Sequence, residues 1–277
     1  MDGSGDFFTQ KSQKTQKGMT QDLVSIIMPS YNCGAYVEET IHSVQAQTYQ
    51  NWEIIFIDDC STDDTVKKVT DLRKKDSRIR LYQNKGNMGA AVSRNNALRE
   101  ANGRWIAFLD SDDLWAPTKL GKQVKFMEAN GYAFSYTGYQ EIDSEGALTG
   151  VEVSGPKHVT KTGMYSFCWP GCLTVMYDRE KIGLVQIEDI KKNNDYAMWL
   201  KVCKKADCYL LDECLAKYRR GRAGSVSSHG IMTMIGWHYK LWHEAEGKNP
   251  VAAMWYTGIN LVYGFYKKMK YVKRVQP

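Results

Sequence analysis

Short apolar runs alternate with stretches of helical spacing over the first half of the chain. Four runs are apolar and rich in β-branched residues: 23–29, 52–58, 79–84 and 105–110. Such runs predict buried strands. Helices are expected after Gly34, after Ser61 and over 90–101, and Ser61 followed by Asp64 resembles a capping box. Strands and helices that alternate with short connections predict an α/β fold with a parallel sheet.

The second half of the chain has a different pattern. Shorter strand-like pieces are expected at 132–142, 172–177 and 209–218, with a helix over 194–205 and a helical, aromatic C-terminal segment. We expect this organisation: a polar, disordered tail at 1–22, a nucleotide-sugar-binding subdomain at 23–137, an acceptor-binding subdomain at 138–228 and a helical segment at 229–277.

Composition and charge exclude only a few classes of protein. With 43% hydrophobic residues in 277, the chain can bury a core, and a net charge of +6 is too small to indicate nucleic acid. No nucleic-acid-binding motif is present, so no nucleic-acid partner is expected. The seven cysteines lack zinc-site spacing and no apolar leader opens the chain. Both features predict free thiols in a reducing, cytoplasmic compartment.

Polar residues follow three of the predicted strands at their carboxyl ends, and two of these strands, 52–58 and 105–110, end in acids. The acids are Asp58, Asp59, Asp110, Asp112 and Asp113. In an open parallel sheet these ends meet in one crevice, where unpaired carboxylates would repel each other. Mg²⁺ typically binds one or two carboxylates together with substrate phosphates. The D-S-D-D cluster therefore predicts a site for a metal-bound diphosphate. Helix capping is the alternative role of acidic residues here, and we assign it to the acids at 63 and 64.

The first strand ends in a turn that disfavours several nucleotide sites. Its sequence, PSYNCGAY, contains no G-x-G-x-x-G, and the chain has no P-loop motif. Tyr31 could stack on a base and Asp59 could accept a hydrogen bond from a base imide. This pair suits uracil or thymine better than adenine. The competing interpretation of Tyr31 is an ordinary core aromatic.

Three motifs in order resemble the inverting glycosyltransferase family 2, which has the GT-A fold. They are SIIMPSYN (25–32), EIIFIDDCSTDDT (53–65) and GNMGAAVSRNNALREANGRWIAFLDSDD (86–113). The resemblance is clear from Leu23 to Trp115 and weaker to Arg222. It implies transfer of a sugar from a UDP-sugar donor to a hydroxyl of a glycan acceptor, with Mn²⁺ or Mg²⁺ as cofactor. Bacterial O-antigen and capsule enzymes are similar in size and ending, which implies a lipid-linked oligosaccharide acceptor.

The resemblance also implies roles for donor-binding residues. Pro29 and Tyr31 would flank the base, which Asp59 would read. Arg94 would lie near the base or diphosphate, with a surface helix arginine as the alternative.

Within the D-S-D-D cluster, the resemblance implies that Asp112 is the metal ligand and that Asp110 lies nearer the ribose. Asp113 is either a further contact or a helix cap before Pro117, and a supporting role is favoured.

A general base is implied further along the chain, in NNDYAMWLKV (193–202), where Asp195 matches the family's catalytic carboxylate. The sequence departs from the family at Asn194, where Glu is common. Asp195 could instead be an ordinary first-turn helix residue beside the macrodipole. Glu188 and Asp189 are nearby substitutes. The implied reaction is a single in-line displacement with inversion, in which Asp195 removes the proton from the acceptor hydroxyl.

Three further features concern the acceptor and the membrane. Trp169 is expected either to line the acceptor cleft or to pack in the core. Arg219, Arg220 and His229 lie in a segment, 218–229, that could close over the donor phosphates, with a solvated loop as the alternative. Residues 249–266 carry no charge and KKMKYVKRV follows. This pattern predicts a buried or interfacial helix and a peripheral contact with the cytoplasmic face of the inner membrane.

Two other functions compete with this prediction. A haloacid-dehalogenase-like phosphotransferase would use D-x-D-x-[TV] after the first strand, whereas here the acidic cluster follows the fourth strand and Leu114 occupies the Thr/Val position. A non-catalytic nucleotide-sugar-binding scaffold would not need Asp59, Asp112 and Asp195 together.

Overall fold

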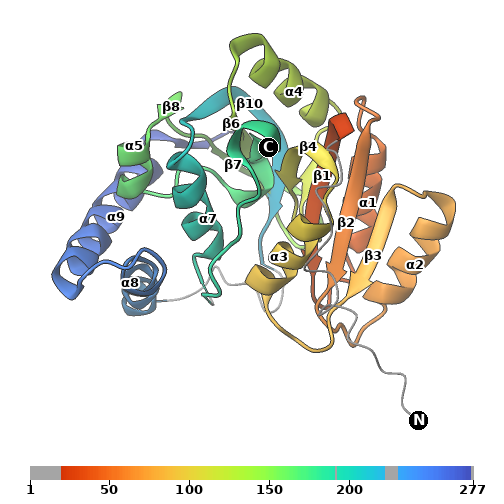
Figure 1. Ribbon diagram of the computed structural model, residues 1–277, viewed down its shortest axis with the longest axis horizontal. Helices are drawn as coiled ribbons and strands as arrows, with labels where there is room; N and C mark the ends of the chain where they lie inside the picture. The colour runs from red at the N-terminus through yellow and green to blue at the C-terminus, as the bar shows by residue number, and fades with distance from the viewer. Residues whose placement is uncertain (1–19, 191, 222–229, 276–277) are drawn as a thin grey trace.

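The computed structural model describes residues 20–190, 192–221 and 230–275, and its first half contains the expected parallel sheet (Figure 1). Parallel strands lie side by side in the order β4-β1-β2-β3: β1 (Thr20–Ser30), β2 (Trp52–Asp58), β3 (Ile79–Gln83) and β4 (Gly103–Phe108). The connections contain α1 (Val37–Gln45), α2 (Thr65–Lys75) and α3 (Ala90–Glu100). The predicted α/β fold is confirmed, and β1 begins three residues before the expected start at Leu23.

The capping box expected before α2 is wrong. The Ser61 hydroxyl accepts a hydrogen bond from the Asn32 N–H, and Asp64 makes no side-chain cap at the helix N-terminus. Asp63 instead accepts hydrogen bonds from the N–H and hydroxyl of Thr65. A turn role for these acids fits their positions, but the capping geometry differs from the one that the spacing suggests.

The second half extends the same sheet with mixed pairing. Its strands are β5 (Leu114–Trp115), β6 (Phe134–Ile142), β7 (Leu148–Val153), β8 (His158–Val159), β9 (Met176–Asp178), β10 (Cys208–Arg219) and β11 (Val272–Arg274). β9 pairs antiparallel with both β4 and β6, while β10 runs parallel to β6. The strand expected at 172–177 is wrong in part, because a 3₁₀ turn, η1 (Cys172–Thr174), precedes a short β9. The closing strand β11, which pairs with β7, was not anticipated.

The second half also contributes helices, several of which lie on the left of the molecule in Figure 1. They are α4 (Lys119–Asn130), α5 (Lys161–Ser166), α6 (Arg179–Ile182), α7 (Asn194–Cys203), α8 (Ile231–Lys240), a π-helical turn η2 (Leu241–Ala245) and α9 (Pro250–Lys270). The helices α8 and α9 lie at the end opposite β3 and α2 (Figure 1). The expected subdomain boundary between 137 and 138 falls inside β6, so the residues on its two sides share one continuous sheet.

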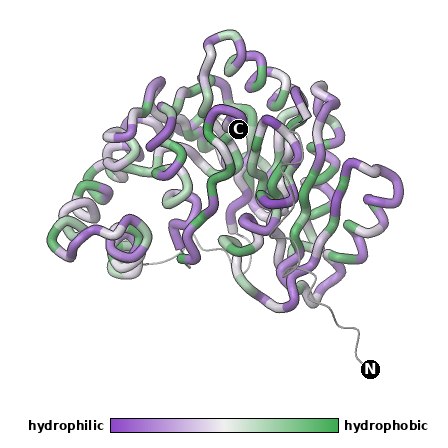
Figure 2. The backbone as a smooth tube through the Cα atoms, in the orientation of Figure 1, coloured by the Kyte–Doolittle hydropathy of each residue, from purple (hydrophilic) through white to green (hydrophobic). Residues whose placement is uncertain are grey.

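Two apolar clusters lie against the sheet. Alternate β1 residues separate between them: Ile26 and Met28 belong to one cluster and Ile27 to the other, as the two-residue period of a strand requires. The hydrophobic residues are concentrated in the central strands, whereas α2 is mostly hydrophilic (Figure 2). Gly103 allows β4 to approach β1 closely, because a Cβ there would lie 2.4 Å from the Leu23 carbonyl oxygen.

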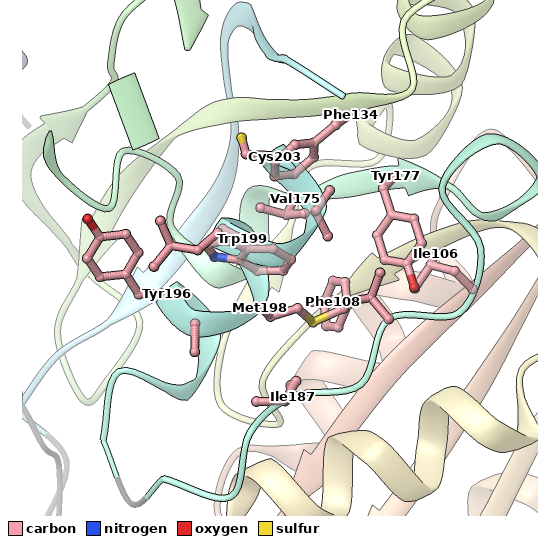
Figure 3. Packing of buried hydrophobic residues seen from close by; sticks show 14 of the residues in the cluster. Ile106, Phe108, Phe134, Val175, Tyr177, Ile187, Tyr196, Met198, Trp199 and Cys203 are labelled. Atoms are coloured by element: carbon pink, nitrogen blue, oxygen red, sulfur yellow. The ribbon is translucent and has the colours of Figure 1, made fainter. Parts of the chain in front are cut away.

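Packing under α7 links this helix to the end of β4. The indole of Trp199 contacts Phe108 edge-to-face, with ring centroids 5.1 Å apart, and lies 5.9 Å from Phe134 (Figure 3). Trp199 is four residues beyond Asp195, and Phe108 is two residues before Asp110. Close packing of these rings therefore holds the N-terminus of α7 and the acidic end of β4 in a fixed relation.

Candidate active site

The strand ends that carry the acids are in register. Ser30 at the end of β1 pairs with Asp58 at the end of β2, which pairs with Gln83 of β3. On the other side of β1, the Leu109 N–H donates to the Ile27 carbonyl just after β4. Parallel pairing therefore brings segments far apart in sequence to one edge of the sheet, as predicted.

Asp59 lies directly after β2 and fixes the loop that leads into α3. One carboxylate oxygen accepts hydrogen bonds from the Asn84 amide (2.7 Å) and the Met88 N–H (2.8 Å). The other oxygen accepts one from the Gly89 N–H at 2.7 Å. A carboxylate has about four lone-pair positions, so one position remains for a ligand.

The expectation that all five strand-end acids face the crevice is wrong for Asp58. It is the last residue of β2 and is fully buried, and one of its oxygens accepts the Ser61 N–H at 3.0 Å. Asp59, the next residue in the sequence, lines the crevice, whereas Asp58 does not. Asp58 therefore shapes the turn rather than the ligand site.

Arg94 of α3 connects two parts of the site. Its guanidinium donates to Asp110 at 2.6 Å and to the side-chain oxygen of Asn194 at 2.8 Å. Burial alone would lower the pKa of Arg94, but the nearby acids, Asp110 first, hold it above its usual range. The alternative of a surface arginine is wrong, because Arg94 is buried and joins β4 to α7.

The acids of the D-S-D-D cluster have different surroundings. Asp112 is partly exposed, whereas Asp113 is buried and accepts the Arg219 N–H at 2.8 Å. Burial, and then the charges of Asp112 and Asp110, raise the pKa of Asp113 well above its usual value. Asp113 is not a helix cap, because the cap position of α4 is Thr118. It accepts a hydrogen bond from the backbone of β10 instead.

Asp195 lies in the first turn of α7. One of its carboxylate oxygens accepts a hydrogen bond from the backbone N–H of Tyr196 at 2.8 Å. It lines the same cavity as the strand-end acids. The proposed substitutes lie elsewhere: Glu188 pairs with Lys201, and neither Glu188 nor Asp189 is part of the cavity wall. Of the three carboxylates, the structure brings only Asp195 to the site.

One cavity of about 560 Å³ collects the predicted residues. Its wall includes Pro29, Tyr31, Asp59, Arg94, Asp110, Asp112, Asp113, Asp195, Arg219 and Arg220. Tyr31 is 43% exposed, so the interpretation of this residue as a core aromatic is wrong. Trp169, in contrast, is a core residue: it is buried, is not part of the wall, and donates its indole N–H to the Gly163 carbonyl at 2.9 Å.

The expected lid residues have different surroundings. Arg219 ends β10 and is buried, and its guanidinium donates to the carbonyls of Asp112, Asp143 and Ser144 and to Glu39. It is therefore an anchor of the wall, and its assignment to a mobile lid is wrong. Exposed Arg220 pairs with Glu141 at 3.0 Å. His229 lies outside the described residues.

Sequence reasoning missed several wall residues. Asn193 adopts a left-handed backbone (φ 57°) at the start of α7, and its buried amide nitrogen has no hydrogen-bond partner among the described residues. The Asn193-Asn194 doublet before a helix was a usable signal, since Asn favours both caps and left-handed positions. Cys172 and Tyr218 carried no comparable signal, although burial and then Asp113 raise the pKa of Tyr218 to about 12.

The acids suit a cation that the substrate helps to bind. Among the described residues, no group of three or more His, Cys, Asp or Glu side chains is arranged to hold a metal alone. Asp110 pairs with Arg94 and Asp113 with the backbone of β10, and Asp112 is partly exposed at the cavity wall. One carboxylate with diphosphate oxygens is an ordinary ligand set for Mg²⁺.

Acids gathered at the ends of parallel strands, with another carboxylate facing them from a helix, place this fold in the GT-A class of glycosyltransferases. Comparison with known proteins goes one step further: the sequence profile described as glycosyl transferase family 2 matches residues 25–165. The chain belongs to this family and is a glycosyltransferase. The phosphotransferase alternative is thereby excluded.

Relatives and solved structures agree with this assignment. The chain is 45% identical over 198 residues to "Putative teichuronic acid biosynthesis glycosyltransferase TuaG" of Bacillus subtilis (strain 168), which covers 71% of this chain and 79% of that protein. It is 38% identical to "UDP-Glc:alpha-D-GlcNAc-diphosphoundecaprenol beta-1,3-glucosyltransferase WfgD" of Escherichia coli over 90% of this chain and 96% of that protein.

Solved structures confirm the fold. The structure of S. aureus TarS 1–349 in complex with UDP-GlcNAc aligns with a TM-score of 0.66 at 20% identity, over 89% of this chain and 74% of that one. The mannosyltransferase PcManGT from Pyrobaculum calidifontis, in complex with GDP-Man and Mn²⁺, aligns with a TM-score of 0.63 at 16% identity, over 93% and 77% of the two chains.

Proposed function

We propose that this glycosyltransferase moves a sugar from a UDP-sugar to a hydroxyl of a lipid-linked glycan, with inversion, in the assembly of a bacterial surface polysaccharide. The observation that carries the proposal is the single cavity in which Asp59, Asp112, Asp195 and buried Arg94 converge from separate segments. The names of relatives such as WfgD, which specify UDP-Glc and a diphosphoundecaprenol-linked acceptor, support the substrate classes. We place the enzyme at the cytoplasmic face of the inner membrane, where such an acceptor is accessible.

The wall residues suit distinct parts of the donor. Tyr31 and Pro29 lie beside Asp59, whose remaining lone-pair position can accept the imide N–H of uracil. Asp110 pairs with Arg94, and we assign it to the ribose. Mn²⁺ or Mg²⁺ bound by Asp112 would neutralise negative charge on the departing diphosphate.

The reaction needs one proton transfer and one displacement. Asp195 accepts the proton of the acceptor hydroxyl as its oxygen attacks the anomeric carbon from the face opposite the diphosphate. The new carbon–oxygen bond forms while the bond to the UDP oxygen breaks, and UDP leaves with the electron pair. The subdomains 23–137 and 138–228 thus serve as donor and acceptor halves of one site.

The proposal is tested by donor binding and by turnover. We expect UDP and UDP-sugars to raise the unfolding temperature more than GDP or dTDP compounds, and to do so mainly when Mn²⁺ is present. Asp112→Asn should abolish the metal-dependent part, whereas Asp212→Asn, at an exposed position on β10, should not. Transfer to a GlcNAc-diphospho-lipid is the second readout. Stabilisation without any transfer or hydrolysis of donors would support the scaffold alternative instead.

A further inference from the structure

The outer face of α9 is a strip of large apolar side chains without a partner in the described part of the chain. Its members recur at spacings of three, four and seven residues, which place them on one side of a helix: Val251, Met254, Trp255, Val262, Phe265 and Met269. Trp255 is 69% exposed and Phe265 is 66% exposed. A strip with this period lies along one side of a helix, so these side chains form one continuous surface. A contiguous exposed apolar surface marks a site of interaction.

The charged residues along this part of the sequence have one sign. From residue 247 to residue 277 the sequence contains no Asp or Glu, and its basic residues gather at the end of α9 and in β11. Lys268 and Lys270 are exposed at the last turn of the helix, and Lys273 and Arg274 follow in β11. Aromatic and apolar side chains flanked by lysines suit the headgroup region of an anionic bilayer, with which each nearby basic residue interacts favourably.

The inner face of the same helix is fully engaged. Asn260 donates to the carbonyls of Tyr165 (3.1 Å) and Ser166 (2.7 Å), and Lys267 donates to the Trp169 carbonyl at 2.7 Å. Gly264 lies so close to Phe167 that a Cβ would be 3.0 Å from its ring. The segment held in this way continues to Gly171 and Cys172 in the cavity wall.

We propose that the outer strip of α9, with its terminal lysines, docks on the surface of an anionic membrane and so holds the acceptor side of the cavity beside the lipid. This inference names the surface for the membrane location given with the proposed function. Among the residues that the structure describes, no helix combines the length and apolar character needed to cross a bilayer. Because the exposed apolar side chains lie along one side of α9, we expect this helix to lie in the interface, parallel to the bilayer surface. Its other side contacts the segment that leads into the cavity wall.

Flotation of the full chain with vesicles tests the surface without any substrate. We expect binding to vesicles of phosphatidylethanolamine and phosphatidylglycerol, weaker binding to phosphatidylcholine, and loss of binding at high salt. Trp255→Ser with Phe265→Ser, and separately Lys268→Gln with Lys270→Gln, should each lower the bound fraction by roughly tenfold or more. Lys67→Gln with Lys75→Gln changes exposed lysines on α2, at the opposite end of the molecule, and should leave binding unchanged.

Two further measurements keep the outcomes distinct. All variants should transfer sugar to a water-soluble acceptor at the wild-type rate, because no changed side chain lines the cavity. If wild-type protein does not float with anionic vesicles, or if the α9 variants float equally well, the docking surface is refuted, whatever the transfer assay shows. If light scattering shows a dimer that the Trp255→Ser and Phe265→Ser changes dissociate, the strip binds a second copy rather than lipid. Failure of transfer with intact flotation would refute the proposed function alone.

Discussion

The two walls of the cavity are built in different ways. On the donor side, the acids follow directly from strands β2 and β4, which pair through β1 in parallel register. On the acceptor side, the wall is held by single side chains across long stretches of sequence, such as Asn260 to Ser166 and Lys267 to Trp169. The donor wall is therefore a consequence of sheet topology, whereas the acceptor wall depends on a few specific contacts.

The largest effect on turnover is expected at Asp195, the proposed general base. Asp195→Asn removes the proton acceptor but keeps the size of the side chain, so turnover should fall by about 10²–10⁴ with little change in donor affinity. Steady-state kinetics with saturating donor measures this loss. Asp189→Asn, exposed and outside the cavity wall, is the matched control. Normal turnover of Asp195→Asn would remove Asp195 from the mechanism.

A smaller loss is expected at the residue that joins the walls. Arg94 donates to Asp110 and to Asn194 with two different nitrogens, and a lysine ammonium cannot reproduce that geometry. We expect Arg94→Lys to lower kcat/KM by about 10- to 100-fold, since misplacement of catalytic groups by an ångström has costs of this size. Arg99→Lys, at an exposed position on the same helix, should be close to wild type. Equal kinetics for the two variants would mean that Arg94 has only a packing role.

The same contrast explains what the sequence could predict. Asp59 and Asp112 could be placed because each follows an apolar run, and parallel strand ends converge by topology. Trp169 could not be assigned, because an aromatic next to Pro and Gly suits a core and a sugar-binding surface equally well. Arg219 was misassigned because sequence does not show that its guanidinium is satisfied by carbonyls from distant loops. The hydrogen bonds from α9 to Ser166 and Trp169 join residues almost a hundred positions apart in the sequence, so local sequence patterns do not predict them.

A stability effect of intermediate size is expected on the acceptor side. Burial lowers the pKa of Lys267 to about 8, although Cys168 and Asp195 oppose the shift. Between pH 8 and the ordinary lysine value near 10.4, the unfolded chain therefore binds more protons than the folded one, and Lys267 makes stability rise with pH. Wild type should gain on the order of 2 kcal/mol relative to Lys267→Met across this window.

Thermal unfolding of the two proteins from pH 7 to pH 10 measures this gain, because the difference cancels other titrating groups. Lys268→Met, on the exposed side of the same helix, should follow the wild-type pH dependence. If the difference in stability between wild type and Lys267→Met does not change with pH, the Lys267 ammonium is solvated. Its hydrogen bond to the Trp169 carbonyl would then be weaker than the 2.7 Å distance indicates.

The smallest effect, and the sharpest comparison, is expected at Asn193. Its amide nitrogen is buried in the cavity wall and has no partner in the part of the chain that the structure describes, and its left-handed backbone position is one that glycine adopts freely. Asn193→Gly should keep the fold while deleting a hydrogen bond to the acceptor, which raises the acceptor KM by up to about tenfold at unchanged donor KM. Asn193→Ala should show the same kinetics but a lower unfolding temperature, because alanine is strained there. Kinetics and melting curves of the pair therefore separate ligand contact from backbone strain. If Asn193→Gly binds the acceptor as well as wild type does, the Asn193 amide plays no part in recognition of the acceptor.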